Sequence, residues 1–121
     1  MLGDFNSEEK TPAGGGSEIG VFAGKGTSSP DDDLVDLHSK ISNDKRATHM
    51  IGAQFDRILV SPQLVSKKGD SKLVLNRVQI RPDLAIQGKP DKEHRDVYYD
   101  IPAAERDLSD HYPIVAEFRW R

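Results

Sequence analysis

The stretch Phe55-Asp56-Arg57-Ile58-Leu59-Val60-Ser61 decides the fold that this sequence predicts. Its side chains alternate, so that Asp56 shares one side with Ile58 and Val60, and apolar residues occur on both sides. Alternation of this kind is typical of a β-strand. Pro62 ends the strand because proline has no N–H to donate to a neighbouring strand.

Two more strands are expected downstream. Leu73 to Ile80 is a run rich in Leu and Val that follows the turn-forming Lys68-Gly69-Asp70-Ser71. Ile114 to Trp120 again alternates, and it begins directly after Pro113. These two runs predict strands over 73–80 and 114–120.

A helix is expected upstream, over about Pro30 to Ser42. The start Ser29-Pro30-Asp31-Asp32-Asp33 combines an N-cap serine, proline at the first helical position and carboxylates at the positive end of the helix dipole. Leu34, Leu37 and Ile41 then follow at helical spacing. The three aspartates could instead form a metal site, but the helix dipole explains them without a ligand.

The remaining segments are mostly loops. Residues 7–28 and 81–108 are rich in Gly, Pro and charged residues and show no periodicity that would bury one face. Met1 to Asn6 resembles the end of a strand whose upstream part is expected to precede it. A helix among strands with apolar residues on both faces predicts an α/β (α+β) arrangement, with a sheet packed against helices.

The composition limits the possible functions. A chain of 121 residues is one domain or part of one, and the absence of cysteine excludes disulfide frameworks and thiolate metal sites. A net charge of −3 gives no reason to expect nucleic-acid binding by charge alone. No apolar run approaches the roughly 18 residues of a membrane span, and Met1 to Asp4 lacks the features of a signal peptide. The compartment stays open.

The first residues that could carry chemistry are Asp4 and Asn6. Side chains two apart on a strand share a face, so a carboxylate and an amide would point together from the strand end while Phe5 anchors the other face. A carboxylate can orient a water and an amide can hold a phosphate oxygen without repelling it. The alternative is an ordinary turn, where Asp and Asn are common.

The second group is Asp56 with Asp110 and His111. A histidine can transfer a proton near neutral pH, and Asp110 could bind a divalent cation. Asp56 has apolar neighbours, so it needs a partner, and His111 is the natural one. The alternatives are a polar turn around residues 109–113 and a salt bridge from Asp56 to Arg57 or Arg119. The other histidines, His38, His49 and His94, show no zinc-ligand spacing and are expected to be solvated.

Taken together and in order, Gly3-Asp4-Phe5-Asn6, Phe55 to Ser61 and Ser109-Asp110-His111-Tyr112-Pro113 resemble the endonuclease/exonuclease/phosphatase superfamily. The resemblance covers residues 1–121 but only the C-terminal half of that domain, with Gln54 where the usual strand motif has Arg. It implies half of a four-layer α/β sandwich, with one mixed sheet and helices packed on one face. It also implies a metal-dependent phosphoesterase, in which an activated water attacks phosphorus in line.

The resemblance assigns roles to these residues. Asp4 would orient the attacking water, Asn6 would hold the phosphate, Asp56 would hold His111, and His111 would contact the phosphate in the transition state. Asp110 and Asp4 would bind Mg²⁺ or Mn²⁺, although the family's main Glu ligand has no counterpart here.

The resemblance also bears on substrates and partners. Substrates would be phosphate esters such as nucleic acids, phosphoinositides or phospholipid headgroups. The expected partner is the N-terminal half or a second copy of the chain. The alternative function is that of a non-catalytic assembly module.

Overall fold

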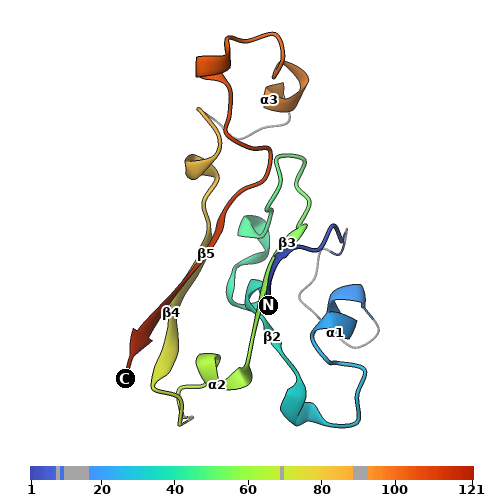
Figure 1. Cartoon of the computed structure of the whole chain (residues 1–121), viewed down its shortest axis with the longest axis vertical. Helices are drawn as coiled ribbons and strands as arrows, with labels where there is room; N and C mark the ends of the chain where they lie inside the picture. Colours follow the sequence, from blue (N-terminus) through green and yellow to red (C-terminus); the bar gives the residue numbers. More distant parts are fainter. Residues whose placement is uncertain (8, 10–16, 69, 89–92) are drawn as a thin grey trace.

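The computed structural model describes residues 1–7, 9, 17–68, 70–88 and 93–121, and it forms two antiparallel sheets (Figure 1). One sheet has three strands in the order β1-β3-β2: β1 Leu2–Asp4, β3 Asp56–Val60 and β2 Val35–Asp36. The other sheet pairs β4, Leu73–Ile80, with β5, Ile114–Trp120. The protein is therefore a small α+β fold. The expectation of one mixed sheet with helices on one face is wrong for the described residues.

Four strands, β1, β3, β4 and β5, lie where the sequence predicts strands, whereas β2 lies in the segment predicted as a helix. β3 falls inside the predicted stretch 55–61, and β4 and β5 coincide with the runs 73–80 and 114–120. β4 and β5 pair along their whole length, from Leu73 opposite Trp120 to Ile80 opposite Ile114. The register shifts between Leu75 and Arg77, which is a β-bulge that lets the long pair twist.

The helices are short. They are α1 Glu18–Phe22, α2 Pro62–Val65 and α3 Glu93–Asp96, with 3₁₀ turns at 30–32, 37–40, 43–45, 82–84 and 103–105. None of these helices, within the described ranges, has the length and apolar character needed to cross a membrane. α1 begins where the Ser17 hydroxyl accepts a hydrogen bond from the Gly20 N–H, so the predicted loop 7–28 contains a short helix. Residues 8 and 10–16 of that predicted loop lie outside the described residues.

The predicted helix over Pro30 to Ser42 is wrong. The chain makes one 3₁₀ turn at 30–32, extends as β2 and makes a second 3₁₀ turn at 37–40. The extended segment pairs with β3, and the Asp36 carboxylate accepts hydrogen bonds from Arg57 Nη1 and the His38 N–H, both at 2.9 Å. Tertiary contacts therefore override the helical spacing.

The neighbouring aspartates have protein partners. Asp33 forms an ion pair with Lys25 at 2.8 Å, and Asp32 accepts a hydrogen bond from the Thr27 hydroxyl at 3.1 Å. Basic and hydroxyl side chains therefore account for these two carboxylates, and the metal alternative is not needed for them.

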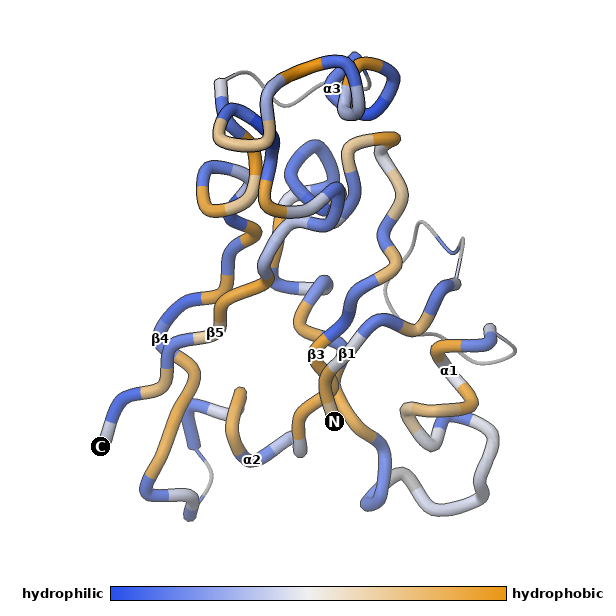
Figure 2. Tube along the Cα trace, turned by 45° about the horizontal axis from the view of Figure 1, so that its top comes forward, coloured by the Kyte–Doolittle hydropathy of each residue, from blue (hydrophilic) through white to orange (hydrophobic). Residues whose placement is uncertain are grey.

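Two apolar clusters hold the fold. The hydropathy trace shows apolar segments along β3 and in α1 (Figure 2). The first cluster lies beside the three-stranded sheet and consists of Ile19, Ala23 and Leu59, with Phe5 and Leu34 packed against them. The second cluster lies near the start of β5 and consists of Met50, Ala85, Ile86 and Tyr112, with Ile80 packed against them. The first cluster packs α1 against β3, and the second fixes the segments that precede β5.

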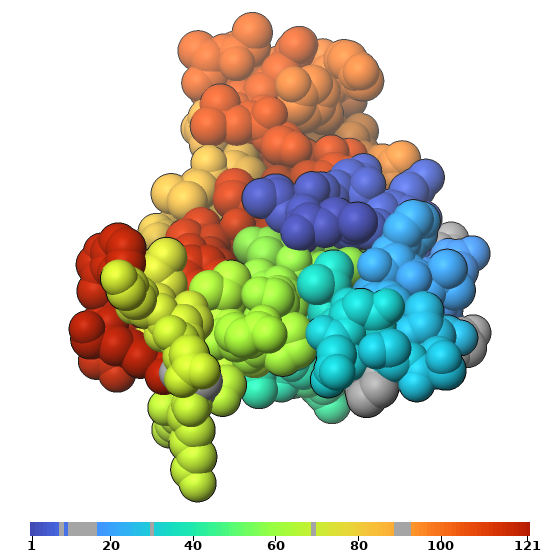
Figure 3. Space-filling model, turned by 60° about the horizontal axis from the view of Figure 1, so that its bottom comes forward, coloured from blue at the N-terminus to red at the C-terminus, as the bar shows by residue number. Residues whose placement is uncertain are grey.

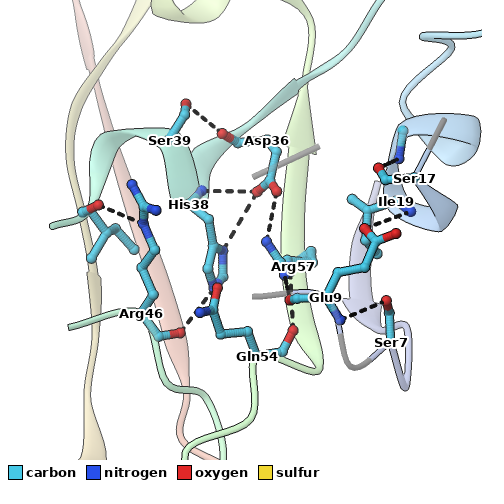
Figure 4. A network of polar contacts seen from close by, with 12 residues as sticks. Ser7, Glu9, Ser17, Ile19, Asp36, His38, Ser39, Arg46, Gln54 and Arg57 are labelled. Atoms are coloured by element: carbon cyan, nitrogen blue, oxygen red, sulfur yellow. Dashed lines mark hydrogen bonds and ion pairs between the residues drawn. The ribbon is translucent and has the colours of Figure 1, made fainter. Parts of the chain in front are cut away.

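A buried polar network crosses the first sheet (Figure 4). The Arg57 side chain is 0% exposed, and its guanidinium donates to the Asp36 carboxylate at 2.9 Å and to the carbonyls of Gln54 and Glu9. Burial lowers the pKa of Arg57, while the neighbouring Asp36 carboxylate opposes that shift. The Arg57 charge can thus stay buried only because the Asp36 carboxylate pairs with it.

His38 belongs to the same network. It is 0% exposed, and its Nε2 lies 3.2 Å from the carbonyl oxygen of Arg46. Because a carbonyl only accepts, Nε2 carries the proton. The expectation that His38 is solvated is therefore wrong.

Candidate functional site

The centre of the candidate site is a carboxylate–imidazole pair. His111 lies just before β5, and its Nδ1 is 2.8 Å from Oδ2 of Asp56, the first residue of β3. The ion-pair partner that Asp56 needs is thus the one expected from the sequence. A carboxylate only accepts hydrogen bonds, so Nδ1 carries a proton and Nε2 is left for other chemistry.

Both members of this pair are anchored. The Asp56 N–H donates to the hydroxyl of buried Thr48 at 3.0 Å, and the His111 N–H donates to the Ser109 hydroxyl at 3.0 Å. The His111 side chain remains 31% exposed and the Asp56 side chain 20% exposed. The pair is therefore fixed in place and still accessible to a ligand.

Asp4 lies next to this pair. In the antiparallel register of β1 with β3, Asp4 is directly opposite Asp56. Residues opposite one another in such a ladder have Cβ atoms about 4.5–5.5 Å apart, and like charges at this distance repel. Two carboxylates at this distance therefore favour binding of a cation between them.

Asn6 is close to Asp4 through the backbone. Its N–H donates to Asp4 Oδ1 at 2.7 Å, and its φ of 48° lies in the left-handed region, which asparagine tolerates. The chain thus also turns at Asn6, as in the alternative interpretation of this segment as an ordinary turn. Both side chains are exposed at the end of β1.

Asp110 has a partner that sequence reasoning missed. His49 Nε2 lies 3.2 Å from Asp110 Oδ2, and the His49 side chain is only 5% exposed, whereas Asp110 is 46% exposed. The segments 48–50 and 110–112 lie antiparallel: the Met50 N–H donates to the Asp110 carbonyl, and the Tyr112 N–H donates to the Thr48 carbonyl. The expectation that His49 is solvated is wrong.

The rings of His49, His111 and Phe55 pack against one another next to the hydrogen bond between His49 and Asp110. The ring centroids of His49 and His111 are 4.8 Å apart, and those of His49 and Phe55 are 5.3 Å apart, both edge to face. No feature of the sequence near His49 indicates this, since its carboxylate partner is 61 residues away. The packing holds the two imidazoles nearly at right angles, His49 bonded to Asp110 and His111 bonded to Asp56.

The hydrogen bonds decide the proton position on His49. Its Nδ1 accepts from the Ile51 N–H at 3.2 Å, so in the neutral ring the proton sits on Nε2 and points to Asp110. One ligand atom each of His49, Asp110 and His111 lies within 4.8 Å of the others. Because Nε2 of His49 is protonated, that imidazole serves Asp110 as a donor, which leaves the Asp110 carboxylate and His111 Nε2 as the available ligands.

The carboxylate–imidazole pair faces a pocket with mainly apolar walls. Asp56 and His111 line a cavity of about 400 Å³ together with Leu2, Leu84, Ala85, Leu108, Ser109, Tyr112, Pro113 and Ile114. Apolar surroundings strengthen the interaction of the pair with any charged ligand. In the space-filling view the N-terminal residues lie at the surface between the α3 segment and β3 (Figure 3).

The third histidine is also paired. His94 Nδ1 lies 2.7 Å from Asp107 Oδ2, and the His94 side chain is 22% exposed. His94 therefore has a buried carboxylate as its partner, outside the group of Asp56 and His111.

Comparisons with protein-family models, curated proteins and solved structures find no match to this chain.

Proposed function

We propose that this chain is part of a metal-dependent phosphoesterase of the endonuclease/exonuclease/phosphatase type. It would hydrolyse a phosphodiester or phosphomonoester by in-line attack of an activated water. The proposal is carried by one observation: Asp4, Asp56 and His111 come from three distant stretches of sequence, and they are joined by a β-ladder pair and a 2.8 Å hydrogen bond.

His111 is the proposed contact to the phosphate. Its Nδ1–H is held by Asp56, so Nε2 can accept a proton or, when protonated, donate to a phosphate oxygen. The Asp56 carboxylate holds the ring so that Nε2 can face the negative charge of the transition state. Asp56 thus acts through His111 as a positioning residue.

Asp4 and Asn6 are proposed to act on the other side of the phosphate. The Asp4 carboxylate is exposed, and only one of its oxygens accepts the Asn6 N–H. The other oxygen can orient a water for attack. The exposed Asn6 amide can donate to a phosphate oxygen without repelling it.

Asp110 and Asp4 are the proposed ligands of a hard divalent cation, a set that shares only Asp110 with the cluster of His49, Asp110 and His111. Asp110 and Asp4 offer exposed carboxylate oxygens, which Mg²⁺ and Mn²⁺ prefer, and His49 orients the first of them. A bound cation would neutralise charge on the phosphate and lower the pKa of a bound water. In this proposal His111 handles the proton and Asp4 orients the attacking water.

Hydrolysis of bis(4-nitrophenyl) phosphate with Mg²⁺ tests this proposal. The chain should release nitrophenol, and Asp4→Ala or His111→Ala should each lower the rate about a hundredfold or more. Asp33→Ala is the matched control, because Asp33 pairs with Lys25 away from the site and its loss should leave the rate unchanged. Equal rates in all four proteins would contradict the proposal.

The same chain also has a feature of an assembly module. Met1 is 63% exposed and Leu2 is 74% exposed at β1, an edge strand of its sheet, and Leu108 is 83% exposed beside the same apolar pocket. Apolar groups gathered in this way favour a covering surface, which we propose is the N-terminal half of such an enzyme or a second copy.

Light scattering at micromolar concentration tests this second proposal. A dimer that dissociates in Leu2→Lys supports a second copy as the cover. A well-folded monomer whose stability is unchanged by Leu2→Lys would contradict the module.

A further inference from the structure

The segment between β4 and β5 is built around a buried carboxylate. Asp107 is 5% exposed, and its Oδ1 accepts from the Gln87 N–H at 2.7 Å. Its Oδ2 lies 2.7 Å from His94 Nδ1, on α3. Asp107 therefore ties two arms of this segment together, so the walls they form have a defined position.

These walls enclose a second cavity next to the candidate catalytic site. It has a volume of about 540 Å³ and is lined by Met50, Arg95, Tyr98, Tyr99, Asp107, Leu108, Ser109 and Asp110. This volume lies in the range of small-molecule sites. The cavity shares Asp110 with the proposed cation site, so a molecule whose phosphate binds there can extend into it.

Two tyrosines form one wall of the cavity. The ring centroids of Tyr98 and Tyr99 are 5.2 Å apart, edge to face, and Tyr99 is 83% exposed. The guanidinium of Arg106 lies 5.3 and 5.8 Å from the two ring centroids and donates to the Ile101 carbonyl at 3.1 Å. The Arg106 guanidinium thus helps to hold the two tyrosine rings in place. Because Tyr99 is not buried, part of its aromatic surface stays accessible to a ligand.

The charges around the tyrosines discriminate between ligand classes. Arg106 already occupies the cation position over both rings, and Arg95 adds a second positive charge, so a quaternary ammonium headgroup is disfavoured. A sugar that carries further phosphates into the cavity is disfavoured by the Asp107 carboxylate in its wall. A flat aromatic ring that carries one phosphate fits both the tyrosines and the charges.

We propose that this cavity binds the nucleobase of a nucleoside phosphate whose phosphate group lies at Asp110 and His111. This inference rests on the proposed function, since it places the phosphate in that site. The base would stack on Tyr98 or Tyr99, and Arg95 would contact the sugar phosphate or the base edge. A free nucleotide and a nucleic-acid strand present the same chemistry to the cavity.

Calorimetric titrations of the full chain in Mg²⁺ test the inference by binding alone. Adenosine 5′-monophosphate should bind about tenfold more tightly than ribose 5-phosphate, which lacks the base. The double variant Tyr98→Ala/Tyr99→Ala should remove this difference, and Tyr98→Phe/Tyr99→Phe should keep it. Trp120→Ala is the matched control, because Trp120 is 72% exposed at the far end of β5. If the double variant fails to fold, the single variant Tyr99→Ala takes its place, and it should lower the preference for adenosine 5′-monophosphate over ribose 5-phosphate.

The outcomes separate this inference from the proposed function. A base preference that persists without hydrolysis of bis(4-nitrophenyl) phosphate supports the cavity and counts against the enzyme. Hydrolysis of this substrate without any base preference supports the enzyme and counts against the base-binding cavity. Tighter binding of a trinucleotide than of the mononucleotide identifies a strand as the source, and equal binding identifies a free nucleotide. Equal affinity for adenosine monophosphate and ribose 5-phosphate, or tighter binding of phosphocholine or inositol monophosphate, would overturn the inference.

Discussion

We expect His111 to act on the phosphate only in the orientation that its hydrogen bond to Asp56 gives it. Asp56→Asn removes the charge and lets the amide present either an oxygen or an NH₂ group to Nδ1, so the imidazole loses its fixed tautomer. We expect a fall in kcat with little change in KM. Steady-state kinetics of the double variant Asp56→Asn/His111→Ala should match His111→Ala alone, because the first residue works through the second. Additive losses would contradict that dependence.

His49 is expected to support cation binding through Asp110. His49→Phe removes the donor to Asp110, and the Mg²⁺ affinity should fall about tenfold or more. His49→Gln keeps an N–H donor and should largely preserve that affinity, as measured by calorimetry. An equal loss in both variants would instead identify His49 as a direct ligand, against the proton position inferred from Ile51.

Sequence reasoning reached the first of these two pairs and missed the second. Asp56 stands out because its neighbours on one strand face are apolar, so a carboxylate there needs a partner. His49 lies in no periodic segment, and its burial depends on the contact of residues 48–50 with 110–112. That contact joins two loops, and pairing between loops produces no periodic pattern of apolar residues in the sequence.

Among the elements, the longer strands were predictable, and the helix and the short strand β2 were not. β5 alternates over seven residues after Pro113, and β4 is a run rich in Leu and Val that follows a turn signal, so their bounds coincide with the prediction. The segment 30–42 has good helix start signals, yet it contains Asp36, which is the ion-pair partner of buried Arg57. A helix there would leave that guanidinium buried without its carboxylate, and this cost exceeds the local helix preference.

The Asp36–Arg57 pair should therefore dominate the stability of the three-stranded sheet. Asp36→Asn leaves a buried charge without its partner and should lower the free energy of unfolding by about 3–5 kcal/mol. Asp33→Asn breaks the partly exposed pair with Lys25 and should cost less than about 1 kcal/mol. Urea denaturation of the two variants compares them directly. Similar midpoints would contradict the role of the buried pair.

At the scale of the whole molecule, the site joins parts of the chain that have separate cores. Asp4 and Asp56 belong to the three-stranded sheet, whereas His111 and Asp110 belong to the segment fixed by Met50 and Tyr112. A ligand that spans both parts should therefore stabilise the entire fold.

Thermal unfolding with Mg²⁺ and inorganic phosphate checks this coupling. At a hundredfold excess over Kd the stabilisation should be about 2.7 kcal/mol, and it should vanish in His111→Ala. Phosphate stabilisation that survives in His111→Ala would place the anion elsewhere on the molecule.

The most direct test of the central claim is the imidazole nitrogen spectrum of His111 by long-range proton–nitrogen NMR. In the neutral ring we expect a proton on Nδ1 and a free Nε2, whose signal shifts when Mg²⁺ and inorganic phosphate are added, and we expect Asp56→Asn to lose this tautomer preference. A His111 ring that is protonated on Nε2, or that is indifferent to phosphate while the protein stays folded, would contradict it.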